Sequence, residues 1–148
     1  LNRGSFNRIF PICCQGKSPF ALVLVDIDHF KSINDTCGHT AGDEAIKRIA
    51  AQLKSAFRSE DYTFRIGGDE FAVIMVDVSE AHRELLEERL RLLCDTVAGS
   101  SAGLPSISIS VGAAFSDRRN PEGTLFNDAD KALYDVKEHG KASYRIFG

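Results

Sequence analysis

The spacing of apolar residues changes along the chain and predicts strands that alternate with helices. Residues 20–27, FALVLVDI, form a short and almost continuous apolar run rich in valine and leucine, as is typical of a strand buried on both faces. Residues 42–57 instead repeat their apolar positions with the period of a helix. The pattern therefore predicts a buried strand followed by a helix with one buried stripe.

Two β-prone segments, residues 62–66 and 71–76, flank the sequence GGDE at positions 67–70. Paired glycines tolerate the positive φ angles of tight turns, so this stretch predicts a β-hairpin with acidic residues at its turn. Ser79 precedes an amphipathic repeat that runs to about Gly99, which predicts a capped helix. This helix should pack on the sheet that contains the hairpin.

The last part of the chain predicts a strand, a helix and a short strand. Residues 106–115 alternate strictly between apolar and small or polar residues, as in a half-buried strand. An amphipathic helix follows the turn-prone residues 120–123 and stops at Gly140, and a short strand ends at Phe147. The order βαββαβαβ predicts an α/β sandwich on a ferredoxin-like βαββαβ core with a mainly antiparallel central sheet.

Length and composition predict one domain over residues 1–148, because 148 residues with 43% hydrophobic residues suffice for a single core. The chain starts at Leu1 rather than at a methionine, and Phe6, Ile9 and Phe10 recur at helical spacing. We therefore expect the sequence to begin inside the first helix of its domain, as a fragment of a longer protein. No apolar run approaches the roughly 20 residues of a membrane helix, which predicts a soluble segment without membrane contact.

Charge and cysteine content narrow the function classes. A formal net charge of -3 argues against a protein that coats a nucleic-acid polymer, which needs a basic face, whereas a small nucleotide bound through a metal remains possible. The cysteines Cys13, Cys14, Cys37 and Cys94 contain no C-x-x-C pair, so they suggest neither a zinc site nor a disulfide framework. We expect free thiols in a reducing compartment.

Acidic residues lie where two predicted elements end. Asp26 and Asp28 close the first strand, and Asp69 and Glu70 lie at the hairpin turn, so we expect four carboxylates to converge at one edge of the sheet. Carboxylates this close repel one another unless a cation neutralises them, and hard oxygen ligands suit magnesium with substrate phosphates. An Asp-x-Asp pair alone is weak evidence, since solvated loops and helix caps also contain it.

The acidic segments carry a family resemblance. Residues 65–71, RIGGDEF, contain the GGDEF signature, and residues 26–31, DIDHFK, resemble the first metal motif of the same family. Residues 110–113, SVGA, and 129–134, ADKALY, match its later strand and its last helix. Essentially the whole chain resembles the GGDEF domain, the catalytic domain of diguanylate cyclases, and this implies a fold like that of nucleotide cyclases and polymerase palms.

The resemblance implies a metal-dependent condensation of two GTP molecules into cyclic di-GMP and pyrophosphate, within a homodimer of domains that each supply half of the site. It implies that magnesium, or alternatively manganese, is held by the carboxylates of Asp26 and Asp69 and by the backbone carbonyl of Ile27. Asp69 and Glu70 both remain candidates for accepting the proton of the attacking hydroxyl, because a metal beside them lowers the pKa of that hydroxyl.

Four residues are implied to bind the nucleoside. Asn34 and Asp43 resemble the residues that read guanine, since a carboxylate accepts from the guanine N1 and N2 donors and an amide meets O6 or N3. Phe30 and His39 are implied to contact the substrate. Asp43 could also cap the following helix, and His39 could be a structural hydrogen bonder.

The phosphates are implied to contact three lysines. Lys31 follows the first metal motif, where family members stabilise the charge that builds on the phosphates. Lys137 and Lys141 stand one turn apart at the end of the last predicted helix, a like-charge pair that an anion would relieve, although either lysine could simply complement the helix dipole. The family usually has arginine at the position of Lys141, so bidentate phosphate binding is lost there.

Arg58 and Asp61 match the inhibitory R-x-x-D motif of the family in its register with the GGDEF signature. The resemblance implies that cyclic di-GMP binds to them and inhibits the enzyme, away from the metal. The alternative is a charged helix end on the surface.

Two other functions compete with catalysis by this domain. A degenerate GGDEF module would bind GTP or cyclic di-GMP and regulate a neighbouring domain, but the intact acids argue against it. Another metal-dependent nucleotidyltransferase would also present paired acids on a similar sheet, and the implied guanine-reading residues argue for the cyclase. The resemblance implies a cytoplasmic domain and leaves open whether the full-length protein is anchored in a membrane.

Overall fold

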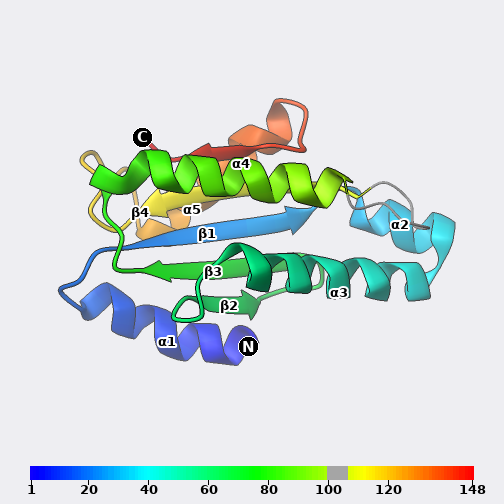
Figure 1. The fold of residues 1–148 in the computed structure, drawn as a ribbon, viewed down its shortest axis with the longest axis horizontal. Coiled ribbons are helices and arrows are strands. Elements are labelled where there is room, and N and C mark those ends of the chain that lie inside the picture. Colours follow the sequence, from blue (N-terminus) through cyan, green and yellow to red (C-terminus); the bar gives the residue numbers. More distant parts are fainter. Residues whose placement is uncertain (100–106) are drawn as a thin grey trace.

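The chain folds into a five-stranded sheet with helices on both faces (Figure 1). The structure is a computed structural model that describes residues 1–99 and 107–148. In chain order the elements are α1 (Arg3–Gln15), β1 (Phe20–Ile27), α2 (Phe30–Cys37), α3 (His39–Ala56), β2 (Tyr62–Arg65), β3 (Glu70–Val76), the 3-10 helix η1 (Glu80–His82), α4 (Arg83–Gly99), β4 (Ile109–Phe115), α5 (Leu125–Glu138) and β5 (Tyr144–Ile146).

The strands lie in the order β2-β3-β1-β4-β5. β1 pairs antiparallel with both β3 and β4, and β5 adds a parallel edge next to β4. The first four strands with α3 and α4 form the ferredoxin-like βαββαβ core that the sequence predicts, with one further helix and strand after it. The predicted fold class is confirmed.

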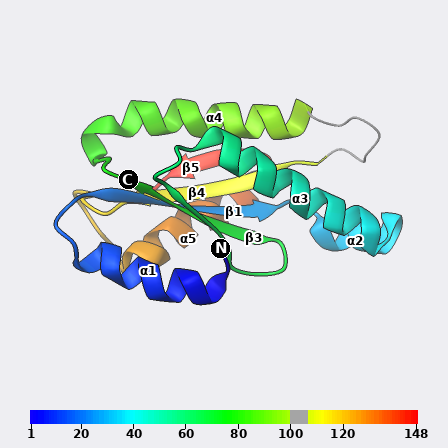
Figure 2. The ribbon, with the colours of Figure 1, turned by 60° about the horizontal axis from the view of Figure 1, so that its bottom comes forward.

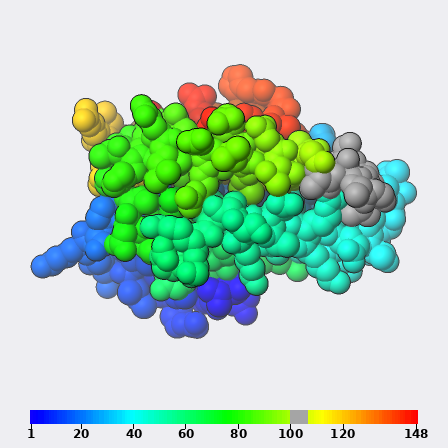
Figure 3. Space-filling model, in the orientation of Figure 1, coloured from blue at the N-terminus to red at the C-terminus, as the bar shows by residue number. Residues whose placement is uncertain are grey.

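Helices cover the two faces of the sheet in pairs. α3 and α4 pack on one face, and α1 and α5 pack on the other (Figure 2). On the first face α3 and α4 lie directly against each other over the sheet (Figure 3). Every residue of β1 is buried, because helices cover both of its sides. The apolar run of this strand therefore has the cause that the sequence suggested.

The register of β1 decides which strand ends lie together. Asp26 at its end lies opposite Glu70, whereas Phe20 at its start lies opposite Val76. The end of β1 and the loop between β2 and β3 therefore lie at the same end of the strands. Residues near Val76 lie at the opposite end of the strands.

Two predicted elements differ from those observed, and one helix was not predicted. α3 begins at His39 rather than at residue 42, and the short helix α2 before it was not predicted. β4 is buried along its whole length rather than half-buried, since α5 covers its second face. A Cβ on Gly112 of β4 would lie 2.2 Å from the backbone nitrogen of Leu133, so glycine permits this close packing. Ser106, the predicted start of the strand, lies outside the described residues.

The β2–β3 turn is closed without left-handed glycines. Gly67 and Gly68 are not among the residues with positive φ, so the predicted reason for these glycines is wrong. The backbone amides of Ile66 and Gly67 both donate to the carbonyl of Glu70, at 2.9 and 3.3 Å. Arg65 adds bonds to the carbonyls of Gly67 and Gly68, at 3.2 and 2.9 Å. These bonds fix the loop that precedes Asp69.

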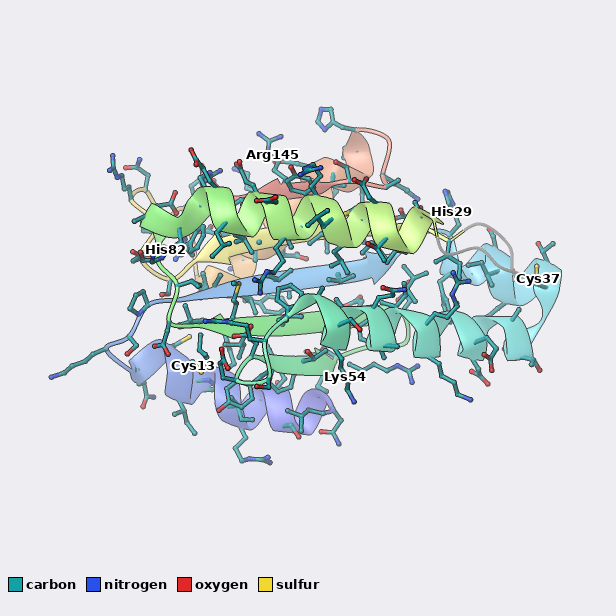
Figure 4. All side chains as sticks on the ribbon, in the orientation of Figure 1. Cys13, His29, Cys37, Lys54, His82 and Arg145 are labelled. Atoms are coloured by element: carbon teal, nitrogen blue, oxygen red, sulfur yellow. The ribbon has the colours of Figure 1, made fainter. Side chains whose placement is uncertain are left out.

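The cysteines are free thiols, as predicted. Cys13 lies on α1 and Cys37 at the distal end of α2, far from each other (Figure 4). Within the described part of the chain, no helix is both long and apolar enough to cross a membrane.

Candidate active site

Three acids converge where β1 meets the β2–β3 loop. Asp26, Asp69 and Glu70 each offer a carboxylate oxygen, and these oxygens lie within 4.8 Å of one another. The amide of Ile27 donates to the carbonyl of Asp69 at 3.1 Å, so a backbone bond joins the strand end to the loop. Asp26 is buried, Asp69 is half-buried and Glu70 is exposed. The cluster therefore opens to solvent on the side of Glu70.

Asp26 is the innermost member of the cluster and is only partly paired. Its Oδ2 accepts a hydrogen bond from Lys137, whereas its Oδ1 is buried without a partner among the described residues. A buried carboxylate oxygen without a donor is costly unless a cation or water satisfies it. Asp26, Asp69 and Glu70 form a hard oxygen donor set, which fits magnesium or manganese.

The electrostatics of the cluster also favour a cation. Burial raises the pKa of Asp26 above its usual value, although the hydrogen bond from Lys137 opposes this. Burial raises the pKa of Glu70, and the charges of Asp26 and Asp69 add to the rise. Burial works to lower the pKa of Lys137, but its bond to Asp26 and the charges of Asp26, Glu70 and Asp69 together outweigh this and raise it. A cation among these acids would stabilise their ionised forms.

Asp28 does not join the cluster, which corrects the expectation of four converging acids. Its carboxylate accepts bonds from the hydroxyls of Ser108 and Ser110, at 2.7 and 2.6 Å, and from the amide of Ala142 at 3.0 Å. These donors saturate the carboxylate and hold it against β4 and the segment before β5. Asp28 therefore fixes the end of β1 structurally.

α5 brings a lysine and a further acid to the cluster. A small cavity of about 60 Å³ is lined by Asp26, Glu70, Asp130 and Lys137, among others. Lys141 follows the end of α5 in a left-handed turn, with φ of 64°, and does not line this cavity. The prediction that the two lysines stand one turn apart on the same helix is therefore wrong. Asp130 was not predicted as a site residue, although its position two turns before Lys137 places it on the same face of the helix.

Asn34 and Phe30 of α2 lie against Gly42 of α3, where the two helices pack together. A Cβ on Gly42 would lie 1.8 Å from the side-chain oxygen of Asn34 and 3.4 Å from the ring of Phe30, so the glycine creates the space for both. Asp43 follows Gly42 in α3 and is exposed. Asp43 lies inside α3, after its first turn, so the suggestion that it caps this helix is wrong. His39 is exposed at the start of α3.

The start of α2 presents backbone amides and Lys31 to solvent. The residue before it, His29, has φ of 56° and makes no side-chain capping bond. Unsatisfied amides at a helix N-terminus favour an anion. Lys31 is exposed in the first turn of α2, close along the chain to Asp26.

Arg58 and Asp61 lie at the end of β2 that is farthest from the acids. The Arg58 Nη2 donates to Asp61 Oδ1 at 3.1 Å, and the Asp61 carboxylate also accepts from the backbone amides of Arg58 and Val76, each at 3.0 Å. The Asp61 side chain is fully buried, while that of Arg58 is 35% exposed. The pair therefore fastens the outer end of the β2–β3 hairpin.

The start of α1 is bonded to the same hairpin at its other end. Arg3 Nη1 donates to the carbonyl of Ile66 at 3.0 Å, and the amide of Arg65 donates to the carbonyl of Leu1 at 3.0 Å. These contacts join the first turn of α1 to the strand that leads into the glycine pair. No motif in the sequence indicated this connection.

The ferredoxin-like core and the acids at the end of β1 define an α/β domain with the palm-like architecture predicted from the sequence. The sequence profile of the family "Diguanylate cyclase, GGDEF domain" matches residues 4–143. The chain belongs to the GGDEF domain family.

Individual relatives agree with this assignment. The chain is 35% identical over 130 residues to the probable diguanylate cyclase DgcT of Escherichia coli K12, a match that covers 84% of this chain and 28% of that protein. It is 40% identical over 143 residues to the response regulator PleD of Caulobacter vibrioides, covering 93% of this chain and 31% of that protein. The chain thus spans less than a third of the length of either relative.

Solved structures share the whole fold. The coiled coil and GGDEF domain of DgcB from Caulobacter crescentus, in complex with c-di-GMP, has a TM-score of 0.84 and 27% identity, and covers 98% of this chain and 80% of that chain. The GGDEF domain of PA1120 from Pseudomonas aeruginosa has a TM-score of 0.82 and 28% identity, and covers 100% of this chain and 96% of that chain.

Proposed function

We propose that this domain is a diguanylate cyclase that condenses two GTP molecules into cyclic di-GMP and two pyrophosphates. The observation that carries the proposal is the buried, unpartnered Oδ1 of Asp26 within a cluster of three carboxylates beside Lys137. This arrangement suits a divalent cation together with phosphates. The family and the relatives named as diguanylate cyclases support the reaction.

Asp26 and Asp69 would hold the divalent metal, with the backbone carbonyl of Ile27 as a further ligand. When bound, magnesium or manganese neutralises triphosphate charge and lowers the pKa of the attacking 3′-hydroxyl. Asp26, Glu70 and Lys137 are close enough to act on one phosphate group, because they line the same small cavity. Asp69 belongs to the acid cluster beside it.

The phosphates would be held by Lys137, by Lys31 and by the first amides of α2. Lys137 can exchange its bond to Asp26 for a bond to a phosphate oxygen once a cation neutralises the charge of Asp26. Lys141 lies farther along the chain, beyond α5, where its flexible ammonium could reach the outer phosphate. These cations stabilise negative charge on the pyrophosphate leaving group.

Guanine would lie beside Gly42, where α2 packs on α3. The Asn34 amide and the Asp43 carboxylate are suited to the N1, N2 and O6 or N3 groups of guanine, and the Phe30 ring provides an apolar surface beside them. His39 is near enough along α3 to contact the same nucleotide. Adenine would leave the Asp43 carboxylate without donors.

In the reaction the 3′-oxygen of each GTP forms a bond to the α-phosphorus of the other, and each α-phosphorus loses its bond to pyrophosphate. Glu70 would accept the proton of the hydroxyl, because its carboxylate lies at the solvent-exposed side of the acid cluster. Asp69 is the alternative acceptor. Two GTP-loaded domains must face each other, so the catalytic unit is a homodimer of domains.

Product analysis tests this function. Purified protein incubated with GTP and magnesium is expected to form cyclic di-GMP and pyrophosphate, with a specific activity that rises with protein concentration. Asp26→Ala and Asp69→Ala should abolish the product, and Glu70→Gln should slow the reaction while GTP still binds. Binding of GTP or cyclic di-GMP without product, even at high protein concentration, would identify a degenerate regulatory module, and turnover of ATP would identify another nucleotidyltransferase.

A further inference from the structure

Asp130 contributes a fourth carboxylate to the cavity beside the acid cluster. It lies on α5 two turns before Lys137, and it lines the same cavity as Asp26, Glu70 and Lys137. Within the described residues it makes no hydrogen bond or ion pair. Its side chain is exposed at the mouth of the site rather than buried among protein donors.

The neighbouring acid on the same helix shows what a structural carboxylate looks like in this fold. Asp128 is buried, pairs with Arg118 at 2.6 Å, and accepts from the amides of Glu122 and Gly123 at 3.2 and 2.9 Å. Asp130 has none of these partners. Its position at the cavity is therefore not explained by folding.

Asp130 adds a further negative charge to a site where the carboxylates of Asp26, Asp69 and Glu70 already repel one another. Burial is the main cause of the raised pKa of Glu70, with Asp26 and Asp69 next, and the charge of Asp130 acts in the same direction. The triphosphate of a nucleotide would be repelled by this carboxylate. The repulsion becomes attraction only when a cation comes with the nucleotide.

We propose that Asp130 is a positioning residue that accepts hydrogen bonds from the water ligands of the bound metal and so makes the site select metal-loaded GTP over free GTP. The inference rests on the proposed function of the site. Magnesium dehydrates reluctantly and keeps several waters, which need acceptors outside the first ring of ligands. An exposed carboxylate at the edge of the cavity supplies such an acceptor without displacing a ligand.

This role predicts that a single variant, Asp130→Asn, binds the metal more weakly but metal-free GTP more tightly. In Asp130→Asn, binding of Mn²⁺ alone should weaken by roughly tenfold, the lower range for outer partners of metal ligands. Binding of GTP in excess chelator should instead tighten by about two- to fivefold, because one repelling charge is removed. A merely structural role would weaken both. Paramagnetic resonance measures free Mn²⁺, and calorimetry measures metal-free GTP.

Asp135→Asn is the matched control, since it removes the same charge from the same helix. Asp135 faces Arg145, 4.0 Å away on the side of β5 (Figure 4 labels Arg145), and is outside the cavity. Neither affinity should change in this variant. Unchanged Mn²⁺ binding in Asp130→Asn, or weaker binding of both Mn²⁺ and metal-free GTP, would overturn the inference while leaving the proposed function intact. A wild-type protein that binds neither Mn²⁺ nor GTP would overturn both.

Discussion

The ammonium group of Lys137 on α5 donates a hydrogen bond to Oδ2 of Asp26 at the end of β1, although 111 positions separate the two residues in the sequence. The bond exists because Gly112 lets α5 approach β4 closely, and β4 lies next to β1. Packing at a glycine therefore places the Lys137 ammonium, the proposed phosphate ligand, beside Asp26, the proposed metal ligand.

Replacing Gly112 by alanine should disturb that packing. Its Cβ would lie 2.2 Å from Leu133 N and 2.5 Å from Ala129 O, and backbone atoms cannot move aside cheaply. We expect Gly112→Ala to lower the free energy of unfolding by about 1 to 3 kcal/mol, the usual cost of overpacking. Urea unfolding measures this. Gly68→Ala is the control, because a Cβ there meets nothing within 4 Å, and equal stability of both variants would contradict the packing argument.

The metal-free domain should gain stability when Asp26 becomes neutral. Asp26→Asn removes one of three clustered charges and offers an amide donor to the remaining acids, so the free energy of unfolding should rise by about 0.5 to 2 kcal/mol. Added magnesium should stabilise the wild type but not the variant. Thermal unfolding with and without magnesium checks both, and a destabilised variant would argue that the Lys137 bond outweighs the repulsion.

The same charges set a pH dependence. The folded domain holds the pKa of Asp26 and of Glu70 above their ordinary values, mainly by burial, so it binds more protons than the unfolded chain between the two sets of values. The stability of the metal-free protein should therefore fall as the pH rises through that interval. Asp26→Asn should flatten this slope, and a slope of the opposite sign would contradict it.

Gly42→Ala should weaken guanine recognition while the fold survives. The new Cβ would lie 1.8 Å from the Asn34 side-chain oxygen, so the amide must turn away from its present position. Loss of one hydrogen bond predicts about three- to tenfold weaker GTP binding. Asn34→Ala should cost a similar amount, and the double variant should add little to either. Calorimetry provides the affinities, and additive losses would mean that the glycine does not act through Asn34.

Arg58→Ala should relieve inhibition by added cyclic di-GMP and leave initial rates near those of the wild type. Inhibition at this distant site should lower kcat, whereas competition for the GTP site would raise KM. Asp61→Ala is a poorer test, because it leaves the amides of Arg58 and Val76 without their acceptor and should destabilise the domain by about 1 to 3 kcal/mol. Equal binding of cyclic di-GMP by wild type and Arg58→Ala would remove the inhibitory site.

The spacing of apolar residues predicted the long helices and strands, because in these elements the apolar residues are the ones that are buried. α2 escaped prediction since only Ile33 of its residues is buried, so it lacks an apolar repeat. β4 looked half-buried because its second face carries Ser110 and Gly112, which are small for contact with Asp28 and α5 rather than for exposure to water.

The acid cluster could be predicted only in part. Strand ends and turns indicated where Asp26, Asp69 and Glu70 meet, but the direction of Asp28 depends on hydroxyls that lie 80 positions or more along the chain. Such partners are set by tertiary packing and leave no local pattern. Asp130 did leave one, in its helical spacing from Lys137.

The hydrogen bonds from Arg3 to Ile66 and from Arg65 to Leu1 connect the start of α1 to the β2–β3 loop, so that the two segments should move together. A small rotation of α1 would pull on the strand that precedes the glycines, and the loop that carries Asp69 would follow. The distance between Asp69 and Asp26 is then the quantity that such a rotation changes. The spacing of Asp26 and Asp69, the two proposed metal ligands, is thereby linked to the position of the first turn of α1.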